Sequence, residues 1–367
     1  AVEQLTREES FGVAHFSIDA AGDTLVYQSA DVLHVMDTAS GTRRTVELDL
    51  GIDYRFDPYV RATVKNEIED YAVSPDGSLT AYVVRGDLFV TRNDEDDDRS
   101  VRLTTGPARD RDVAWLDDHT LLFVSDREGQ YDLHRLSSGD AEEPDLFASL
   151  KHRVARMTAT PEDEFDPVVA PDGEHLVLRR GRGTLVSARI GPAGDLTEIA
   201  TLVDGWATPS AVSFSPDSRW LAYGLSDLTF NEEVYIQATD GSTEPVNVSM
   251  HPRQDTDPVW SPDGSKLGFV SGRNNGDDDI WFVWLDETDW ERSKEEWRRR
   301  AFMEDEPEED ADASEDDVPA APEVHIDLDG IHERLTQVTA MPSNETALVF
   351  DAEGEFVYFT VGGAGRK

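Results

Sequence analysis

Histidine can bind metals and transfer protons near neutral pH, and this chain carries nine histidines. They occur at positions 15, 34, 119, 134, 152, 175, 251, 325 and 332. No two of them lie three to five residues apart and none belongs to an HExxH motif, so their spacing indicates no metal site. His34, His134 and His175 fall in stretches of alternating apolar residues, where we interpret them as ordinary strand residues.

The sequence also contains no motif for nucleophilic catalysis or for phosphate binding. The chain has no cysteine, which excludes disulfides, thiolate metal sites and cysteine nucleophiles. It has neither a G-x-S-x-G elbow nor a glycine-rich phosphate loop. Pairs of carboxylates carry no information among 77 Asp and Glu residues. The sequence therefore predicts no catalytic residue, no metal site and no cofactor.

Runs of aspartate and glutamate at residues 94–98 and 277–279 could suggest calcium binding. They lack the glycine and the distal glutamate of an EF-hand loop. We interpret both runs as solvated hairpin tips.

The elements that would position a site are copies of one β unit, clearest at Pro258–Glu287. There, Ser261–Gly264 (SPDG) predicts a tight turn, because Pro presets φ, Asp caps its own backbone and Gly accepts a positive φ. Alternating apolar residues follow the turn and predict a strand, and the almost wholly apolar stretch 280–285 predicts another.

This unit recurs along the chain. Clear copies begin at Ser74, Ala170 and Ser215, and degenerate copies begin at Ser17, Trp115 and Phe350. Aligned on the turn glycine or its replacement, the copies stand at 22, 77, 118, 173, 218, 264 and 354, in steps of 55, 41, 55, 45, 46 and 90 residues. Periods of about 40–50 residues with several strands each are typical of β-propellers, in which each four-stranded sheet is a blade. The alternative is a β-sandwich with unrelated Pro-Asp-Gly turns.

We predict an all-β fold, a seven-bladed β-propeller of four-stranded blades that fills residues 1–367 as a single domain. The expected blades lie near 11–50, 68–105, 111–150, 165–203, 210–249, 256–286 and 345–361, and a strand at 2–6 is expected to complete the last blade.

An insertion at residues 287–323 separates blade six from the last blade. It is expected to begin with an amphipathic helix over Asp289–Met303, with Asp286 or Thr288 as its cap. Residues 304–317 contain ten Asp or Glu and no basic residue, which predicts a disordered acidic loop.

The charge of the chain is its most unusual property. Its 33 basic residues, of which only five are Lys, face 77 acidic ones, and the net charge is −44. Such a surface repels itself at low salt, and molar salt screens that repulsion. We therefore expect a protein of a halophile; an acidic surface for one basic partner is the alternative. The same charge argues against binding nucleic acid or anionic membranes.

The ends of the chain give further expectations. No apolar run approaches the roughly 20 residues that span a bilayer. The chain starts at Ala1 without a signal sequence, and it ends one hairpin into a repeat. We expect an excised piece of a longer polypeptide.

The repeats and the segments between them resemble a known family. The S-P-D-G repeat, with D-[IL]-[WYF] about 20 residues later, is similar to the repeats of TolB and of tricorn proteases. From about Val2 to Phe359, the order of ESFGVAHFSID, SADVLHVMDTASGTRRTVEL, IEDYAVSPDGSLTAYVVRGDLFV and the later HIDLDGIHERLTQVTAMPSN resembles the second propeller of tricorn-type serine peptidases of family S41.

The resemblance implies a propeller that filters or conducts peptide substrates to an active site located elsewhere. PDZ and catalytic domains would follow on the same polypeptide, the catalytic residues would lie there, and the parent would be a homo-oligomer. If Arg109 and Arg111, just before an inner strand, face the channel, they could steer peptide carboxylates. Surface arginines that balance local acids are the equal alternative.

Two other classes of protein stay open. A TolB-like propeller would bind a partner protein without peptidase activity, and a prolyl-oligopeptidase-type lid would gate an α/β-hydrolase. The expected location is the salt-filled cytoplasm of a halophile, with a periplasmic or exported protein as the alternative.

Overall fold

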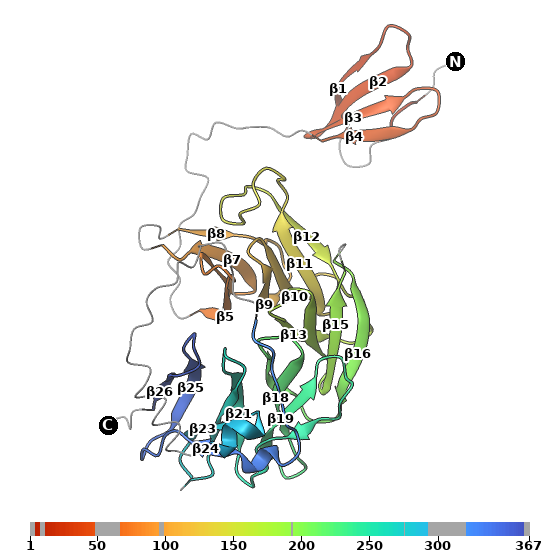
Figure 1. The fold of residues 1–367 in the computed structure, drawn as a ribbon. Coiled ribbons are helices and arrows are strands. Elements are labelled where there is room, and N and C mark those ends of the chain that lie inside the picture. The colour runs from red at the N-terminus through yellow and green to blue at the C-terminus, as the bar shows by residue number, and fades with distance from the viewer. Residues whose placement is uncertain are drawn as a thin grey trace, which may run out of the picture. The chain divides into compact units, whose positions relative to one another are not determined.

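The structure, a computed structural model, describes residues 4–7, 12–47, 67–94, 99–191, 194–274, 276–292 and 321–362. It is built almost wholly of β-strands in seven antiparallel sheets, which we number blades 1–7 in chain order (Figure 1). The chain divides into two compact units, Ala1–Val64 and Lys65–Lys367, and each is described by itself. That all seven blades form a single closed domain stays a prediction.

Unit 1 contains blade 1, a four-stranded sheet in the order β1-β2-β3-β4. Its strands are β1 (Val13–Ile18), β2 (Thr24–Ser29), β3 (Val32–Asp37) and β4 (Arg43–Val46). Its small apolar cluster consists of Leu25, Tyr27 and Met36. The predicted strand at 2–6 is wrong over residues 4–6, which are not in a strand because no neighbouring strand pairs with them; residues 2 and 3 lie outside the described residues.

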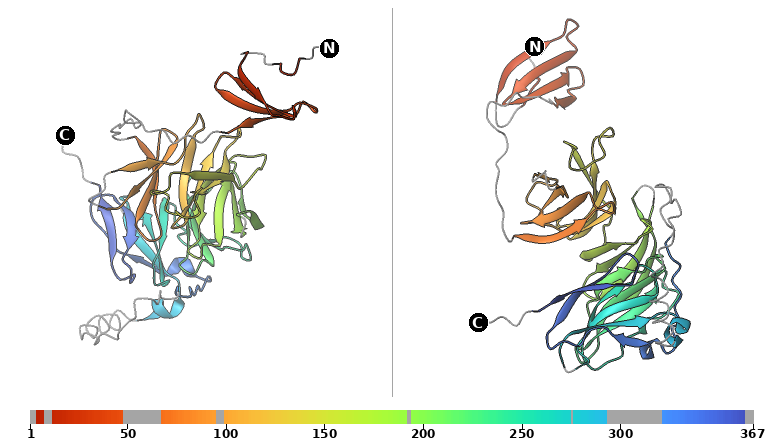
Figure 2. Two further views of the ribbon diagram at one scale, coloured as in Figure 1. Left: turned by 90° about the horizontal axis from the view of Figure 1, so that it is seen from above. Right: turned by 60° about the vertical axis from the view of Figure 1, so that its left-hand side comes forward.

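Unit 2 contains blades 2–7, in which each strand pairs with its neighbour in the sequence (Figure 2). Blade 2 consists of β5 (Ile68–Val73), β6 (Leu79–Val84), β7 (Asp87–Arg92) and β8 (Ser100–Arg102), and blade 3 of β9 (Asp110–Asp117), β10 (Thr120–Ser125), β11 (Asp132–Ser138) and β12 (His152–Arg156). Blade 4 consists of β13 (Glu164–Val169), β14 (His175–Arg180), β15 (Thr184–Ile190) and β16 (Leu196–Asp204), and blade 5 of β17 (Ser210–Phe214), β18 (Trp220–Ser226), β19 (Glu232–Ala238) and β20 (Val246–Asn247). Blade 6 consists of β21 (Asp255–Trp260), β22 (Lys266–Ser271), β23 (Asp279–Trp284) and β24 (Leu335–Gln337), and blade 7 of β25 (Glu345–Phe350) and β26 (Val357–Val361).

The turn between the first two strands of a blade has the chemistry that the sequence predicts. In the turn of blade 6, the Ser261 hydroxyl donates to Asp263 Oδ1 (2.5 Å) and accepts the N–H of Lys266 (2.9 Å). Gly264 has a φ of 72°, and Gly77 has a φ of 74° at the same place in blade 2. These turns are therefore stabilised by contacts between residues that are close in the sequence.

In unit 2, apolar side chains form clusters between neighbouring blades. Blades 2 and 3 share one cluster, blades 3 and 4 a second, blades 4 and 5 a third, blades 5 and 6 a fourth, and blades 6 and 7 a fifth. Buried tryptophans strengthen two of these contacts: Trp115 donates to the Ala72 carbonyl (2.9 Å) and Trp260 to that of Ser213 (3.3 Å). The main apolar clusters of unit 2 thus depend on pairs of blades.

Two predicted blade limits need correction. Blade 3 does not end at residue 150, because its fourth strand is β12 at His152–Arg156. Blade 6 does not end at residue 286, because its fourth strand β24 follows the insertion and pairs with β23. The sequence analysis missed both fourth strands because a long connection separates each of them from the third strand of its sheet.

The two ends of the insertion lie together. The helix α1 (Glu287–Glu291) begins after Asp286, whose carboxylate accepts the N–H of Thr288 (2.6 Å). The Glu287 N–H donates to Asp327 Oδ2 (2.8 Å), and the Asp327 N–H donates to the Leu285 carbonyl (3.0 Å). Asp286 is thus confirmed as the cap; the rest of the predicted helix beyond residue 292 and the acidic stretch 304–317 lie outside the described residues.

Arg334 closes this return path. It follows the 3₁₀ turn η1 (Ile331–Glu333), is 4% exposed, and donates to the carbonyl oxygens of Trp284 (3.1 Å), Leu285 (3.2 Å) and Asp327. The basic residue after the IDLDGI motif therefore ties the returning chain to the end of β23. Among the described residues, no helix combines the length and the apolar character needed to cross a membrane.

Candidate functional site

The first strands of blades 2–7 gather side by side. β5 contacts β9, β9 contacts β13, β13 contacts β17, β17 contacts β21, and β21 contacts β25. Each of these strands is the first of its sheet and lies at one edge of the strand order. The fold thus brings together residues that are a whole blade apart in the sequence, on the strands expected to line a channel.

A β-bulge changes the direction of side chains near the start of each of these strands. The pairing of all six with their second strands shows a register shift. At five of the bulges one non-glycine residue has a positive φ, and these residues are Asp112, Asp166, Ala211, Asp257 and Ala347. Such conformations are uncommon and cluster at functional sites. The repeated strain marks this end of the first strands as a candidate binding surface.

Buried acids anchor the starts of four first strands. They are Asp110, Glu164, Asp255 and Glu345, and none is more than 2% exposed. Arginines of the same hairpin bond three of them, in the pairs Arg127–Asp110 (2.8 Å), Arg180–Glu164 (3.0 Å) and Arg273–Asp255 (2.9 Å). Because these charges are paired inside the protein, the bulge beside them is held in one position.

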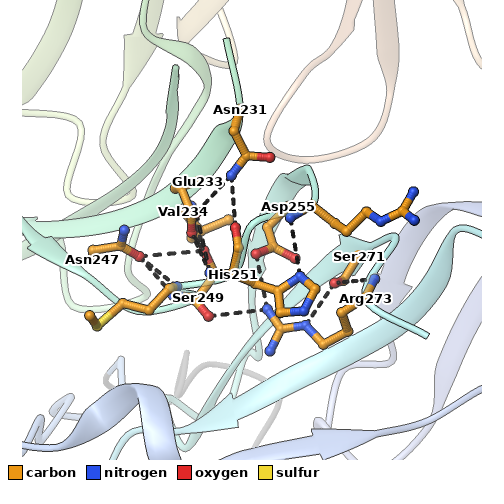
Figure 3. A network of polar contacts seen from close by, with 11 residues as sticks. Asn231, Glu233, Val234, Asn247, Ser249, His251, Asp255, Ser271 and Arg273 are labelled. Atoms are coloured by element: carbon orange, nitrogen blue, oxygen red, sulfur yellow. Dashed lines mark hydrogen bonds and ion pairs between the residues drawn. The ribbon is translucent and has the colours of Figure 1, made fainter. Parts of the chain in front are cut away.

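The network at the junction of blades 5 and 6 shows how far this anchoring reaches (Figure 3). Arg273 donates to Asp255 (2.9 Å), to the Ser271 hydroxyl (2.8 Å) and to the Ser249 carbonyl (3.2 Å). The Ser249 hydroxyl in turn donates to Glu233 (2.8 Å) on β19. Polar contacts therefore run from the third strand of one blade to the first strand of the next.

Arg109, the first of the two predicted contact residues, joins blades 2 and 3. Its guanidinium lies 2.8 Å from Glu69 on β5, and its backbone N–H donates to Asp126 (2.7 Å). Gly86, with a φ of 79°, leaves room for it, since a Cβ there would lie 3.1 Å from Arg109 Cγ. The side chain of Arg109 remains 59% exposed.

Arg111, the second predicted residue, joins blades 3 and 4. It bonds the neighbouring Asp112 (2.8 Å), and its guanidinium lies 5.1 Å from the centre of the Phe165 ring and 5.8 Å from that of Tyr131. Arg179 lies 4.6 Å from the same Phe165 ring. We call Arg111, Tyr131, Phe165 and Arg179 the arginine–aromatic stack. Cations within about 6 Å of a ring centre are attracted by its electrons, so the rings hold both guanidinium groups in place.

The electrostatics of the stack follow from partial burial. Burial raises the pKa of the Asp112 carboxyl, against the opposing effect of its bond from Arg111. Burial also disfavours the charged form of Arg111, but the bond to Asp112 and the charges of Asp112 and Asp166, together with Tyr131, outweigh it, and the pKa of Arg111 is raised. The guanidinium therefore stays charged while its side chain is 40% exposed. It can bind a carboxylate or carbonyl oxygen on its open side.

Sequence reasoning found two members of this surface and missed the rest. Both predicted arginines have acid partners, as arginines that balance local acids would, and they join different blade junctions; their role as contact residues stays a prediction. Phe165 and Arg179 were missed. Phe165 occupies in blade 4 the strand position that Arg111 occupies in blade 3, and an alignment of the blades at the bulge would have paired them.

In the described part of the chain, no three His, Cys, Asp or Glu side chains are close enough to hold a metal ion. His134 is fully buried, where its ring nitrogens contact Glu128 (2.9 Å) and the Asp132 carbonyl (2.9 Å), so it is a core residue. A hollow of about 790 Å³ lies at the turn end of blades 2 and 3, away from the stack, and its Arg92 is paired with Asp145 (2.9 Å).

Comparison with solved structures decides the architecture. The structure of tricorn protease covers 94% of this chain with a TM-score of 0.53 at 14% sequence identity. The fold is a β-propeller. A putative TolB from Agrobacterium tumefaciens also matches the propeller, over 70% of this chain, with a TM-score of 0.43 and 20% identity.

Comparison of the sequence with known proteins does not establish a family. No protein-family model matches it. The uncharacterized peptidase YuxL of Bacillus subtilis is 25% identical over 222 residues, which is 58% of this chain and 30% of that protein. The chain thus spans about a third of the length of YuxL and of tricorn protease, since it covers 32% of the latter.

Proposed function

We propose that this propeller is a non-catalytic part of a tricorn-like serine peptidase of family S41 that conducts peptide substrates to a catalytic domain outside the chain. The observation that carries the proposal is the arginine–aromatic stack on the gathered first strands. A fixed, partly exposed guanidinium beside aromatic rings suits a peptide, which offers a terminal carboxylate, carbonyl oxygens and apolar side chains.

Two comparisons support the proposal. Tricorn protease is a protease by name and shares the fold, and YuxL is named a peptidase. The composition of the arginine–aromatic stack fits a binding role, because its four residues include no nucleophile beside a base, which serine peptidases require.

The surface can recognise both ends of a short peptide. Arg111 offers its open side to a carboxylate. The exposed carboxylate of Asp166, paired with Arg179, lies on the adjacent first strand β13, and that of Asp257 lies on β21, two first strands further along the series. An amino terminus carries a positive charge that such acids attract. Each contact is weak in molar salt, so the surface would bind peptides transiently and release them again, as a conduit must.

The proposal also covers the partners of the protein and its location in the cell. PDZ and catalytic domains of the same polypeptide are the proposed partners, in a homo-oligomer. The net charge of −44 supports a halophile, with the cytoplasm as the proposed location. A TolB-like interaction propeller without peptidase activity is the competing function.

The experiment compares this chain with the whole product of its gene, on fluorogenic peptides in about 2–4 M KCl, which screens the surface charge. We expect the chain to be inert and the whole product to cleave. Arg111→Ala in the whole product should raise KM roughly tenfold for peptides with a free carboxyl terminus, the effect of losing about one charge-assisted hydrogen bond. It should change KM little for amidated peptides.

Arg219→Ala provides the matched control. Arg219 is 62% exposed and ion-paired, like Arg111, but it lies at the turn end of blade 5. Turnover by the chain alone would show that an active site lies inside the propeller. An inactive whole product would instead favour the TolB-like function.

A further inference from the structure

Three junctions between blades 2 and 6 combine an acid of a third strand with the acid that starts the next first strand: Asp87 with Asp110, Asp132 with Glu164, and Glu233 with Asp255. The junction of blades 4 and 5 instead has Thr184 and Ser210 at these places. At the first two of the three junctions both acids bond an arginine, because Arg102 bonds Asp87 (2.6 Å) and Arg156 bonds Asp132 (2.6 Å) in addition to the arginines on Asp110 and Glu164. At the third, Arg273 bonds Asp255, and Glu233 accepts bonds from neutral groups. A buried carboxylate needs an ion-pair or hydrogen-bond partner, because it is costly to leave unpaired.

The junction of blades 6 and 7 differs from these three. Its acids are Asp279, 1% exposed, and Glu345, 0% exposed. Where Arg156 stands in blade 3, blade 6 has Gln337, whose amide donates to Asp279 (3.2 Å). Glu345 accepts a bond from the Ser343 hydroxyl (2.6 Å). Neither acid has an ion pair among the described residues.

In blade 7 the sequence has no arginine at the position from which Arg127 and Arg273 reach their acids. Arg127 and Arg273 each stand two residues after the second-strand residue that pairs with the buried acid. In blade 7 that second-strand residue is Val361, and Gly363 stands two residues later. The side chain that supplies the cation at the other junctions is missing from the sequence here.

The two carboxyl groups instead interact with one another. Asp279 Oδ1 and Glu345 Oε2 have no donor among the described residues, and the same is true of one oxygen each of Asp132, Glu164 and Asp255. Those three acids bond an arginine through their other oxygen, which Asp279 and Glu345 do not among the described residues. Burial raises the pKa of Asp279, and the neighbouring Glu345 raises it further, against the bonds from Asn274 and Gln337. One proton placed between two carboxyl groups supplies the missing donor, and it leaves one negative charge instead of two.

We propose that Asp279 and Glu345 share one proton and that this carboxyl pair makes the attachment of blade 7 to blade 6 dependent on pH. The pair lies where the attachment is made. The Glu345 N–H donates to the Asp278 carbonyl (2.7 Å), and Leu348 packs with Ile280 in the shared apolar cluster. Loss of the shared proton puts two charges into this buried contact and loosens β25 and β26.

Other charged groups around the pair do not replace the proton. On the blade 6 side, Arg273 is bound to Asp255, and Arg253 lies against Gly276 of the connecting loop. Asp277 and Asp278 of the same loop add negative charge. β24 contributes the neutral Gln337, and the described residues before β25 contribute the neutral Ser343 and Asn344.

The sign of the effect follows from the raised pKa. A carboxyl group with a raised pKa in the folded state is protonated there more readily than in the unfolded chain. Its contribution to stability is therefore complete below its ordinary pKa of 3.8 and is lost as the pH rises through the folded value. Blade 7 should be held most firmly in acid and least firmly in alkaline solution.

The test is the replacement Glu345→Gln, which keeps the shape of the side chain and supplies an amide donor to Asp279. Thermal unfolding and hydrogen exchange of residues 345–361 would be measured from pH 5 to 8.5 in constant KCl of about 2 M. Relative to wild type, the variant should gain about 2–4 °C in Tm at pH 8, and its advantage should vanish toward pH 5. Asp279→Asn should behave in the same way.

Asp255→Asn is the matched control, because this acid has an arginine partner. Its replacement should lower Tm at every pH above 5 by leaving Arg273 unpaired. An equal loss of stability in Glu345→Gln would overturn the proposal, and so would protection of residues 345–361 that does not vary with pH. Stabilisation of the wild type, but not of Glu345→Gln, by K⁺ or Ca²⁺ in place of choline at pH 8 would identify a cation instead of a proton between the carboxyl groups. The outcome does not depend on peptidase activity.

Discussion

Replacing Arg273 by Met tests whether the buried ion pairs within the blades hold the fold together. Arg273 is 9% exposed and Asp255 0% exposed in their side chains, so both charges are shielded from water. The guanidinium lies 5.3 Å from the centre of the Phe269 ring and 5.0 Å from that of Trp281, and it donates to Ser271. Met fills much of the same space beside the rings but cannot neutralise Asp255.

The expected loss can be estimated from the state of Asp255 after the replacement. Its Oδ1 already lacks a donor, so removal of Arg273 leaves the buried carboxylate without its ion-pair partner. Breaking one side of a buried ion pair costs about 3–5 kcal/mol. Replacing both partners, in Arg273→Met with Asp255→Leu, removes the unpaired charge and should lower the free energy of unfolding by no more than about 1 kcal/mol relative to wild type.

The assay is urea unfolding in constant KCl, followed by tryptophan fluorescence, on wild type, both single variants and the double variant. A loss below about 1 kcal/mol in Arg273→Met, or a double variant as unstable as the sum of its parts, would refute the reasoning.

Two further predictions concern the turns. Gly264→Ala and Gly77→Ala both place a side chain at a φ above 70°, but only at Gly264 would the new Cβ lie 2.9 Å from Val324. Urea unfolding should therefore show a free energy of unfolding about 1–3 kcal/mol lower in Gly264→Ala than in Gly77→Ala. Equal losses in the two variants would contradict the packing argument. The bond from the Ser74 hydroxyl, aided by those from Ser78, lowers the pKa of Asp76 to about 2 from an ordinary 3.8, so an NMR titration should find Asp76 still ionised at pH 3. The stabilising effect of ionised Asp76 is then present above pH 3.8 and lost as the pH falls toward 2. Ser74→Ala should move the titration midpoint of Asp76 to higher pH, and an unchanged midpoint would count against the role of the hydroxyl.

The regular parts of the fold were predictable because their chemistry is local. Ser261–Gly264 predicts its turn from four adjacent residues, and the structure shows the expected hydroxyl–carboxylate bond and positive φ. The helix cap at Asp286 was also predictable, because the capping carboxylate and the N–H that donates to it are two residues apart. The all-β fold followed from the spacing of these turns.

The anchors between blades were not predictable in the same way. Asp132 and Glu164 are buried beside two arginines, but 77 acidic residues in the sequence give no sign of which few are buried. Their recognition needs the register between neighbouring blades, which depends on bulges that follow no simple residue pattern. For the same reason Arg111 was proposed as a contact residue without its partner Phe165.

The paired ends of the insertion have an evolutionary consequence. The chain leaves blade 6 after β23 and returns to the same sheet as β24, and the bond between Glu287 and Asp327 fastens departure and return to each other. For a flexible segment between two fixed ends, each doubling of length costs only about 0.6 kcal/mol. Blade 6 can therefore accept longer, shorter or wholly different sequences at this point while the cores between blades stay unchanged. The connection between β23 and β24 is therefore a position at which related chains can acquire new segments, and at which a reporter domain could be inserted.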